Sequence, residues 1–164
     1  MVKGSYKEVE GDLIKMAKSR QFDVIAHGAN CKCVMSAGIA AQIKKYFPEA
    51  YYADKYNSRI GYQKLGCLSE CYYHEHKLTI FNLYSQFKLG AEFDLLFFTS
   101  ALTKMKMNLE YRLSIFDTGI LKIGLPMIGC GIGGGNWLEV KAVIQDVLKD
   151  FDVTVVIYSP EEGV

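Results

Sequence analysis

The chain has 164 residues and a formal net charge of +1, and half of its residues are hydrophobic. This length and composition fit one domain with a good-sized core. The near-neutral charge excludes a strong field that would make nucleic acid or an acidic membrane the main partner, and no apolar run reaches the roughly 20 residues that cross a bilayer.

The distribution of charges and cysteines indicates the cellular compartment of the protein. We expect no signal peptide, because Lys3, Glu8 and Glu10 interrupt any apolar run near residue 1. Five cysteines, an odd number spread along the chain, indicate reduced thiols rather than a disulfide framework. We therefore expect a cytoplasmic protein.

The first half of the chain shows strand and helix patterns in alternation. The predicted elements are an edge strand over residues 6–10, a short helix that begins within 11–14 and runs through 17, a central strand over 22–27, a polar loop over 28–38, a helix from 38 to the proline at 48, and a more polar helix over 49–56. Asp12 can cap the first helix. In the next helix, the side chains predicted to share one face are Ile39, Ile43, Tyr46 and Phe47.

The second half continues the alternation. The predicted elements are strands over 66–73 and 78–83 joined at 74–77, a loop over 84–90, a helix over 93–113, a buried strand over 121–128, a helix over 137–148 capped by Asn136, and a last strand over 153–158 ended by Pro160. This order predicts an α/β fold with right-handed crossovers and a mostly parallel sheet covered by helices on both faces.

A glycine-rich loop separates the strand over 121–128 from the helix that follows. It contains Gly129, Gly131, Gly133, Gly134 and Gly135. Glycines let backbone N–H groups approach a ligand, and the helix N-terminus behind them favours negative charge, so the loop predicts a phosphate site. A turn that merely accommodates unusual dihedral angles is the alternative. The pattern matches neither a P-loop nor a dinucleotide-binding fingerprint.

Three predicted loops leave strands at one edge of the sheet. They follow His27, Leu83 and Ile128 and carry glycine and polar residues. In sheets of this kind, ligands bind outside the carboxyl ends of the strands. The sequence therefore predicts a ligand cleft among these three loops.

Three separated motifs together resemble the macrodomain family, whose members bind ADP-ribose. They are Gly11-Asp12-Leu13-Ile14, Asn30 with Gly38-Ile39-Ala40, and Pro126 to Trp137. The match runs in order from about residue 6 to residue 158, and it implies a single three-layer α/β/α macrodomain over residues 1–164 with a mixed, mostly parallel central sheet.

Three shorter pieces are most similar to one branch of that family. They read A-H-G-A-N-C, N-L-Y-S-Q and I-G-C-G-I-G-G-G-N-W. The branch contains phage and bacterial proteins that process ADP-ribose 1''-phosphate, the fungal phosphatase of the same substrate, and the deacylating macrodomains.

The resemblance implies roles for several polar and aromatic residues. Asp12 would read the exocyclic amine of adenine, Asn30 would bind the distal ribose, and Tyr158 would stack on adenine. The residues alone leave a local alternative open at each position. Asp12 can cap a helix, Asn30 can stabilise its own turn, and Tyr158 can pack at the rim. The implied ligand-binding residues are Asp12, Leu13, Asn30, Ser36, Ala37, Gly38, Ile39, Ser85, Gly129, Gly131, Ile132, Gly133, Gly134 and Tyr158.

His27 ends the predicted central strand three residues before Asn30. An imidazole there would take up a proton or attack phosphorus, and the fungal phosphatases have a histidine at the corresponding place. The alternative is a histidine buried behind the loop. Our hypothesis is that His27 acts on the terminal phosphate of ADP-ribose 1''-phosphate.

Two departures from the family pattern disfavour deglycosylation through a lysine. Family members with that activity carry a lysine after the strand that here ends near Tyr84, and this sequence has Gln86 there, with Lys88 two residues further on. The deacylases also carry an aspartate in the glycine loop, where this sequence has Gly133. Glutamine cannot form the covalent adduct.

Three functions therefore stay open. They are hydrolysis of ADP-ribose 1''-phosphate, removal of ADP-ribose from protein or nucleic acid, and binding of ADP-ribose without chemistry. We expect a monomer whose partner is ADP-ribose or an ADP-ribosylated substrate, with no cofactor, no membrane partner, and nucleic acid only as an ADP-ribosylated substrate.

Two other groupings receive structural interpretations. The cysteine spacings C-x-C at 31–33 and C-x-x-x-C at 67–71 are not those of zinc knuckles, so we predict no metal site. The tyrosine pairs at 51–52 and 72–73 have no accompanying basic stripe, so we predict that they pack on their helix and strand rather than stack on nucleic acid.

Overall fold

A computed structural model describes residues 3–116 and 119–159. Pro160, expected to end the last strand, lies outside these ranges. In chain order the elements are β1 (Ser5–Gly11), α1 (Leu13–Lys18), β2 (Val24–Asn30), α2 (Gly38–Tyr46), α3 (Pro48–Lys55), the short 3-10 helix η1 (Gly61–Lys64), β3 (Leu68–Tyr73), β4 (Leu78–Gln86), α4 (Leu95–Ile115), β5 (Lys122–Leu125), α5 (Trp137–Val147) and β6 (Asp152–Tyr158).

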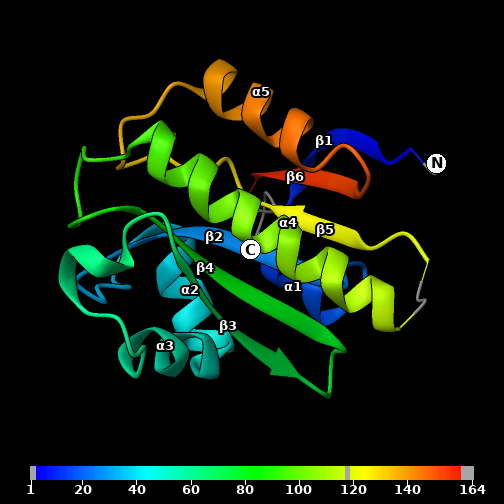
Figure 1. The fold of residues 1–164 in the computed structure, drawn as a ribbon, viewed down its shortest axis with the longest axis horizontal. Helices are drawn as coiled ribbons and strands as arrows, with labels where there is room; N and C mark the ends of the chain where they lie inside the picture. Colours follow the sequence, from blue (N-terminus) through cyan, green and yellow to red (C-terminus); the bar gives the residue numbers. More distant parts are fainter. Residues whose placement is uncertain (1–2, 117–118, 160–164) are drawn as a thin grey trace.

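The strands form one mixed, mostly parallel sheet in the order β1-β6-β5-β2-β4-β3 (Figure 1). All neighbours pair in parallel except β3 and β4, which form an antiparallel hairpin. The prediction of a mostly parallel sheet is confirmed, and β1 is an edge strand as expected.

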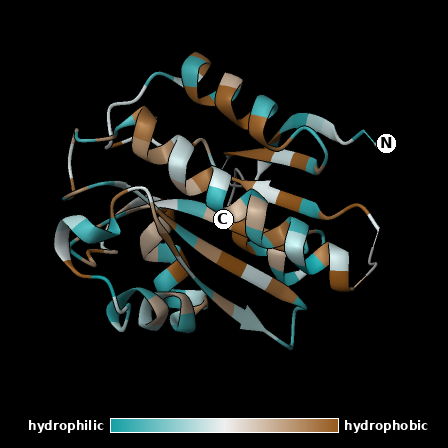
Figure 2. Cartoon of the chain, viewed as in Figure 1, coloured by the Kyte–Doolittle hydropathy of each residue, from teal (hydrophilic) through white to brown (hydrophobic). Residues whose placement is uncertain are grey.

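Helices cover both faces of the sheet. On one face, α4 and α5 pack on a core that includes Phe81, Phe98 and Val155. On the other face, α1, α2 and α3 pack on a second core around Ile25 and Ile80. Figure 2 shows brown, hydrophobic stretches along β4 and β6, which lie between these helix layers. Burial of these apolar surfaces is the main force that holds the three layers together.

Three strands end three residues away from the predicted position. β2 continues past His27 to Asn30, and β4 continues past Leu83 to Gln86, because the two strands pair in parallel up to Asn30 and Gln86. β5 stops at Leu125, since Pro126 has no N–H group to continue the ladder. The loop after β5 is therefore longer than expected and brings Pro126 and Ile128 to the edge of the sheet.

Capping residues set three helix starts, and the sequence predicted two of them, Asp12 and Asn136. Asp12 accepts a hydrogen bond from the Lys15 N–H, and Asn136 accepts from the N–H groups of Leu138 and Glu139. Asp94 caps α4 in the same way as Asp12 and Asn136, through the N–H groups at 96 and 97.

One face prediction was wrong, because Tyr46 is 43% exposed while Ile43 is buried.

Within the described ranges, no helix combines the length and apolar character needed for a membrane span.

Candidate functional site

A cleft of about 520 Å³ opens at the carboxyl edge of the sheet. Its floor is formed by the ends of β2, β4 and β6, and its walls by the loops that follow β2 and β5 together with the start of α2. Its volume falls within the range of about 300–1,000 Å³ that is typical of small-molecule sites. The cleft lies where the three predicted loops were expected to meet.

The first wall of the cleft contains the start of α2. Ala37, Gly38, Ile39 and Ala40 all line the cleft. Ala37 is the N-cap residue and has an extended backbone, and no side chain caps the helix. The first N–H groups of α2 therefore lack the capping partner that α1, α4 and α5 have, and a helix start of this kind favours an anion.

The second wall is the glycine loop, which packs against Phe93. Gly129 has a φ of 76°, and an added Cβ atom there would collide with the Phe93 ring. The loop is closed by a hydrogen bond from the Gly135 N–H to the Gly129 carbonyl at 2.6 Å. A Cβ atom on Gly131, by contrast, would meet no atom within 4 Å. Gly129 and Gly135 thus shape the loop, while Gly131 presents backbone to the open cleft.

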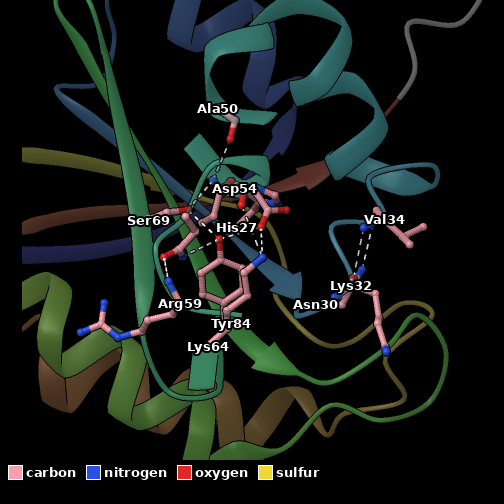
Figure 3. Close-up of polar contacts among 12 residues, drawn as sticks. His27, Asn30, Lys32, Val34, Ala50, Asp54, Arg59, Lys64, Ser69 and Tyr84 are labelled. Carbon is pink, nitrogen blue, oxygen red and sulfur yellow. Dashed lines mark hydrogen bonds and ion pairs between the residues drawn. The ribbon is translucent and has the colours of Figure 1, made fainter. Parts of the chain in front are cut away.

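Asn30 lies in the cleft lining, but its side chain already stabilises its own turn. Its Nδ2 donates to the Val34 carbonyl at 2.8 Å, and its Oδ1 accepts from the N–H groups of Lys32 and Val34. Figure 3 shows these contacts between Asn30 and the following loop. The local interpretation of Asn30 is therefore confirmed, and one amide hydrogen and the cleft-facing edge of the group are left for a ligand.

Gln86 also lines the cleft, and its side chain stabilises the loop after β4. Its Nε2 donates to the carbonyls of Lys88 at 2.7 Å and Gly90 at 3.1 Å, which closes the loop after β4. Its Oε1 lies 3.0 Å from the place that a Cβ atom on Gly133 would take. The Lys88 ammonium does not line the cleft and lies 3.6 Å from Glu92.

Ser85 is the one lining residue among the described ranges whose buried hydroxyl group has no hydrogen-bond partner. The side chain is at the end of β4 and the residue is 1% exposed. Its Oγ lies 3.2 Å from the place that a Cβ atom on Gly28 would take, so the missing side chain of Gly28 leaves space beside the hydroxyl group. An unpaired buried hydroxyl is costly unless a ligand or water supplies its partner.

Among the residues that the structure describes, none that lines the cleft is Asp, Glu, Lys, Arg or His. The lining includes the thiol group of Cys130, and burial raises the pKa of that thiol. The thiol donates to the Ile128 carbonyl at 3.2 Å. Charge in a bound ligand would therefore meet backbone N–H groups and neutral side chains.

His27 does not line the cleft. It is fully buried in β2, and its Nε2 lies 2.6 Å from the Oδ1 of Asn82. The Asn82 amide nitrogen donates to Ala50 and Ser69, so its oxygen accepts and the His27 Nε2 carries the proton. Burial lowers the pKa of His27, so the ring is neutral. This placement does not support the predicted attack on a phosphate group.

A buried polar network continues from Asn82 to α3 and η1 (Figure 3). Ser69 joins Asn82 to the hydroxyl group of Tyr84, which donates to Asp54 at 2.7 Å. Asp54 also forms an ion pair with Lys64 at 2.8 Å, and both side chains are buried. Burial, followed by the Asp54 charge, raises the pKa of Tyr84 well above its usual range. The network fixes η1 to the end of β4, beside the cleft.

Most of the residues implied by the sequence motifs line the cleft. They are Leu13, Asn30, Ala37, Gly38, Ile39, Ser85, Gln86, Gly129, Gly131, Ile132, Gly133 and Tyr158. The residues named from the sequence that do not line it are Asp12, His27, Ser36, Lys88 and Gly134.

Sequence reasoning missed Gln42 and much of the apolar lining. The missed residues include Gly28, Val34, Met35, Gln42, Leu89, Met127, Cys130 and Val156. One usable signal was present, the small Gly28-Ala29 pair at the end of a buried strand, where a bulky side chain would fill the cleft. The other missed residues reach the cleft through the packing of loops against one another, which local sequence patterns do not predict.

Comparison with known proteins gives two relatives that match along most of the chain. No family model matches the sequence. An uncharacterized 17.5 kDa protein of Enterobacteria phage T4 is 35% identical over 161 residues, which cover 94% of this chain and 97% of that protein. The human ADP-ribose glycohydrolase OARD1 is 26% identical over 159 residues, covering 92% and 89%.

Solved structures show the same fold. The macrodomain of Thermus aquaticus DarG superposes with a TM-score of 0.73 at 23% identity, covering 96% of this chain and 99% of that one. Thermosipho africanus DarTG in complex with ADP-ribose gives a TM-score of 0.69 at 22% identity, covering 99% of this chain and 44% of that one.

Proposed function

The chain belongs to the macrodomain family, and from this membership and the chemistry of its cleft we infer that it binds ADP-ribose. One observation carries the proposal. The uncapped start of α2 and the glycine loop form two walls of backbone around one cleft, and the described residues that line it carry no charged side chain. A diphosphate is a suitable anion for such a site, because backbone N–H groups and a helix start hold phosphate without lysine or arginine.

The order of the strands supports an orientation for the ligand. Tyr158 lies at the end of β6 and Gln86 at the end of β4, and β5 and β2 lie between them. Three strand spacings of about 4.8 Å separate the two ends of the cleft by roughly 14 Å. We place adenine beside Leu13 and Tyr158, and the distal ribose beside Asn30 and Gln86.

Asp12 lies next to the proposed adenine end although it does not line the cleft. Its Oδ1 caps α1. A carboxylate has further acceptor sites, so the cap leaves capacity for the exocyclic amine of adenine. Both interpretations of Asp12 from the sequence are therefore compatible with each other.

Hydrolysis of an ADP-ribose derivative is the second candidate function. It is supported by the similarity to the human ADP-ribose glycohydrolase over 92% of the chain. The terminal phosphate of ADP-ribose 1''-phosphate is the substrate proposed from the sequence motifs, and ADP-ribosyl groups on protein or nucleic acid are the alternative. Because no lysine is among the described residues of the lining, a water molecule held by the neutral groups of Asn30, Ser85 or Gln86 would be the nucleophile in either case.

The test has two stages. Isothermal titration calorimetry with ADP-ribose is expected to give one-to-one binding, and no heat at millimolar ligand would overturn the proposal. Phosphate release from ADP-ribose 1''-phosphate, and ADP-ribose release from a modified protein or oligonucleotide, then separate the two hydrolytic activities from binding alone. Unchanged turnover in a folded His27→Ala variant would exclude direct action by His27.

A further inference from the structure

A group of exposed aromatic and basic side chains lies beside the β4 end of the cleft. It is formed by the segment over residues 55–63, which joins α3 to η1 and is drawn in teal at the left of Figure 1, together with Lys32 and Phe87. Tyr56 is 73% exposed and Tyr62 is 71% exposed. Tyr52, which was predicted to pack on its helix, is 49% exposed and stacks on Tyr56.

Tyr62 and Phe87 form a flat aromatic pair. Their ring centroids are 3.8 Å apart and the ring planes differ by 7°. The Lys32 ammonium lies 4.7 Å from the centroid of the Phe87 ring. Since Phe87 covers one face of Tyr62 and most of the Tyr62 surface remains exposed, the outer face of this ring is available for a further flat group.

One cation, Lys32, lies against this aromatic pair, and the adjoining segment adds further exposed cations. The stretch over residues 55–64 contains Lys55, Arg59 and Lys64 and no acidic residue. Lys64 is neutralised by buried Asp54, which leaves Lys55 and Arg59 exposed together with Lys32. The whole chain carries a net charge of only +1, so this local excess is not visible in the composition.

The position of the group connects it to the cleft. Phe87 directly follows Gln86, and Lys32 lies between Asn30 and Val34 in the same loop. Gln86, Asn30 and Val34 all line the cleft. A chain that passes over the aromatic pair would therefore reach the β4 end of the cleft.

We propose that Lys32, Tyr62, Phe87 and the exposed segment over residues 55–63 bind single-stranded nucleic acid. Bases stack on the outer face of Tyr62, and the phosphates lie against Lys32, Lys55 and Arg59. Every base offers a π-face, so the surface binds with little sequence preference. A protein partner would lack the phosphates that exposed lysine and arginine side chains attract. The proposal does not depend on ADP-ribose binding, which concerns the neighbouring cleft.

The test is fluorescence anisotropy with a labelled single-stranded dT12 at 50 mM salt. We expect Tyr62→Ala to weaken binding by at least about fivefold, because stacking contributes about 1–3 kcal/mol per base, and Lys32→Ala to weaken it through loss of a phosphate contact. Tyr62→Phe keeps the stack and should bind like the unaltered protein. Tyr111→Ala, which removes an exposed tyrosine of α4 that is 69% exposed, is the matched control and should bind like the unaltered protein.

Salt provides a second readout. Three phosphate contacts predict a slope of about −2 in a plot of log affinity against log salt for a single strand. Lys32→Ala should reduce the size of this slope, whereas Tyr62→Ala should not. The proposal is overturned if dT12 does not bind, if Tyr111→Ala weakens binding as much as Tyr62→Ala, or if polyglutamate binds as tightly as dT12.

ADP-ribose titration of the Tyr62→Ala variant separates this proposal from the proposed function. Unchanged ADP-ribose affinity together with weakened dT12 binding supports two distinct surfaces. If the unaltered protein binds dT12 but no ADP-ribose, the proposed function fails and the nucleic-acid surface stands.

Discussion

The Oε1 of Gln86 lies 3.0 Å from the place that a Cβ atom on Gly133 would occupy. These are the two positions at which the lysine and aspartate of related deglycosylating enzymes were expected from the resemblance. They are adjacent in this fold, but glutamine closes its own loop and glycine leaves no room for a side chain. The two cleft loops therefore pack closely at this pair, and the Phe93 N–H donates to the Gly133 carbonyl at 3.1 Å.

Substitution of Gly133 should destabilise the protein. An added Cβ atom would lie 3.0 Å from Gln86, 3.1 Å from Phe93 and 3.2 Å from the Gly129 carbonyl. We expect Gly133→Ala to lower the free energy of unfolding by about 1–3 kcal/mol, the usual cost of overpacking. Urea unfolding of the variant and of the unaltered protein measures this loss in the free energy of unfolding. Gly131→Ala is the control, because its Cβ meets no atom within 4 Å and should leave stability unchanged or slightly higher. Equal losses in the two variants would contradict this account.

Removal of the Ser85 hydroxyl group should separate stability from binding. The Oγ is buried without a protein partner, so Ser85→Ala removes an unpaired polar group and should maintain or raise the melting temperature of the ligand-free protein. If the hydroxyl group pairs with the distal ribose, the same variant should bind ADP-ribose about 5- to 10-fold more weakly, as expected for loss of one hydrogen bond worth about 1 kcal/mol. ADP, which lacks the distal ribose, should bind the variant and the unaltered protein equally. A lower melting temperature with unchanged ADP-ribose affinity would indicate a purely structural serine.

His27 should make the protein less stable in mildly acidic solution. Burial lowers the pKa of His27 in the folded state, whereas an unfolded histidine has a pKa of about 6.5. Between these two values the unfolded chain binds more protons, so stability is complete above pH 6.5 and falls as the pH drops toward the lowered folded pKa. Urea unfolding at several pH values between 5 and 7.5, with His27→Gln for comparison, measures the effect. The variant should show a smaller pH dependence, and an equal dependence would contradict a neutral buried His27.

The buried Asp54–Lys64 pair should be far more sensitive than an exposed pair. Lys64→Ala leaves the Asp54 carboxylate buried without its cation, which should cost about 3–5 kcal/mol of unfolding free energy. Lys88→Ala removes a partner of Glu92 from an exposed pair and should cost no more than about 1 kcal/mol. Similar losses for the two variants would mean that Asp54 finds another partner when Lys64 is removed.

The sequence predicted the elements and the general place of the site because both depend on local patterns. Alternating apolar runs identify the strands, and Asp12 and Asn136 mark helix starts through their own side chains. The glycine loop was recognisable for a similar reason, since five glycines before a capped helix indicate close approach of backbone to a ligand.

Residue roles were harder to predict because they depend on contacts between distant segments. Whether His27 faces the cleft depends on the strand face to which it points, and β2 continues for three residues beyond it. The partner of its ring, Asn82, is 55 residues away along the chain. The exposed cluster around Tyr62 was equally hidden, since Lys32, Tyr62 and Phe87 come from three separate segments.

Calorimetric titration of ADP-ribose into the unaltered protein and a Gly131→Trp variant tests the central claim most directly. Gly131 lines the cleft and a Cβ atom there meets no described atom within 4 Å, so a bulky indole can be placed on the cleft wall without a clash at its Cβ atom. We predict one-to-one binding to the unaltered protein and loss of binding in the variant, with equal melting temperatures. Equal affinities for ADP-ribose in the two proteins would show that the ligand binds elsewhere and would contradict the assignment of this cleft.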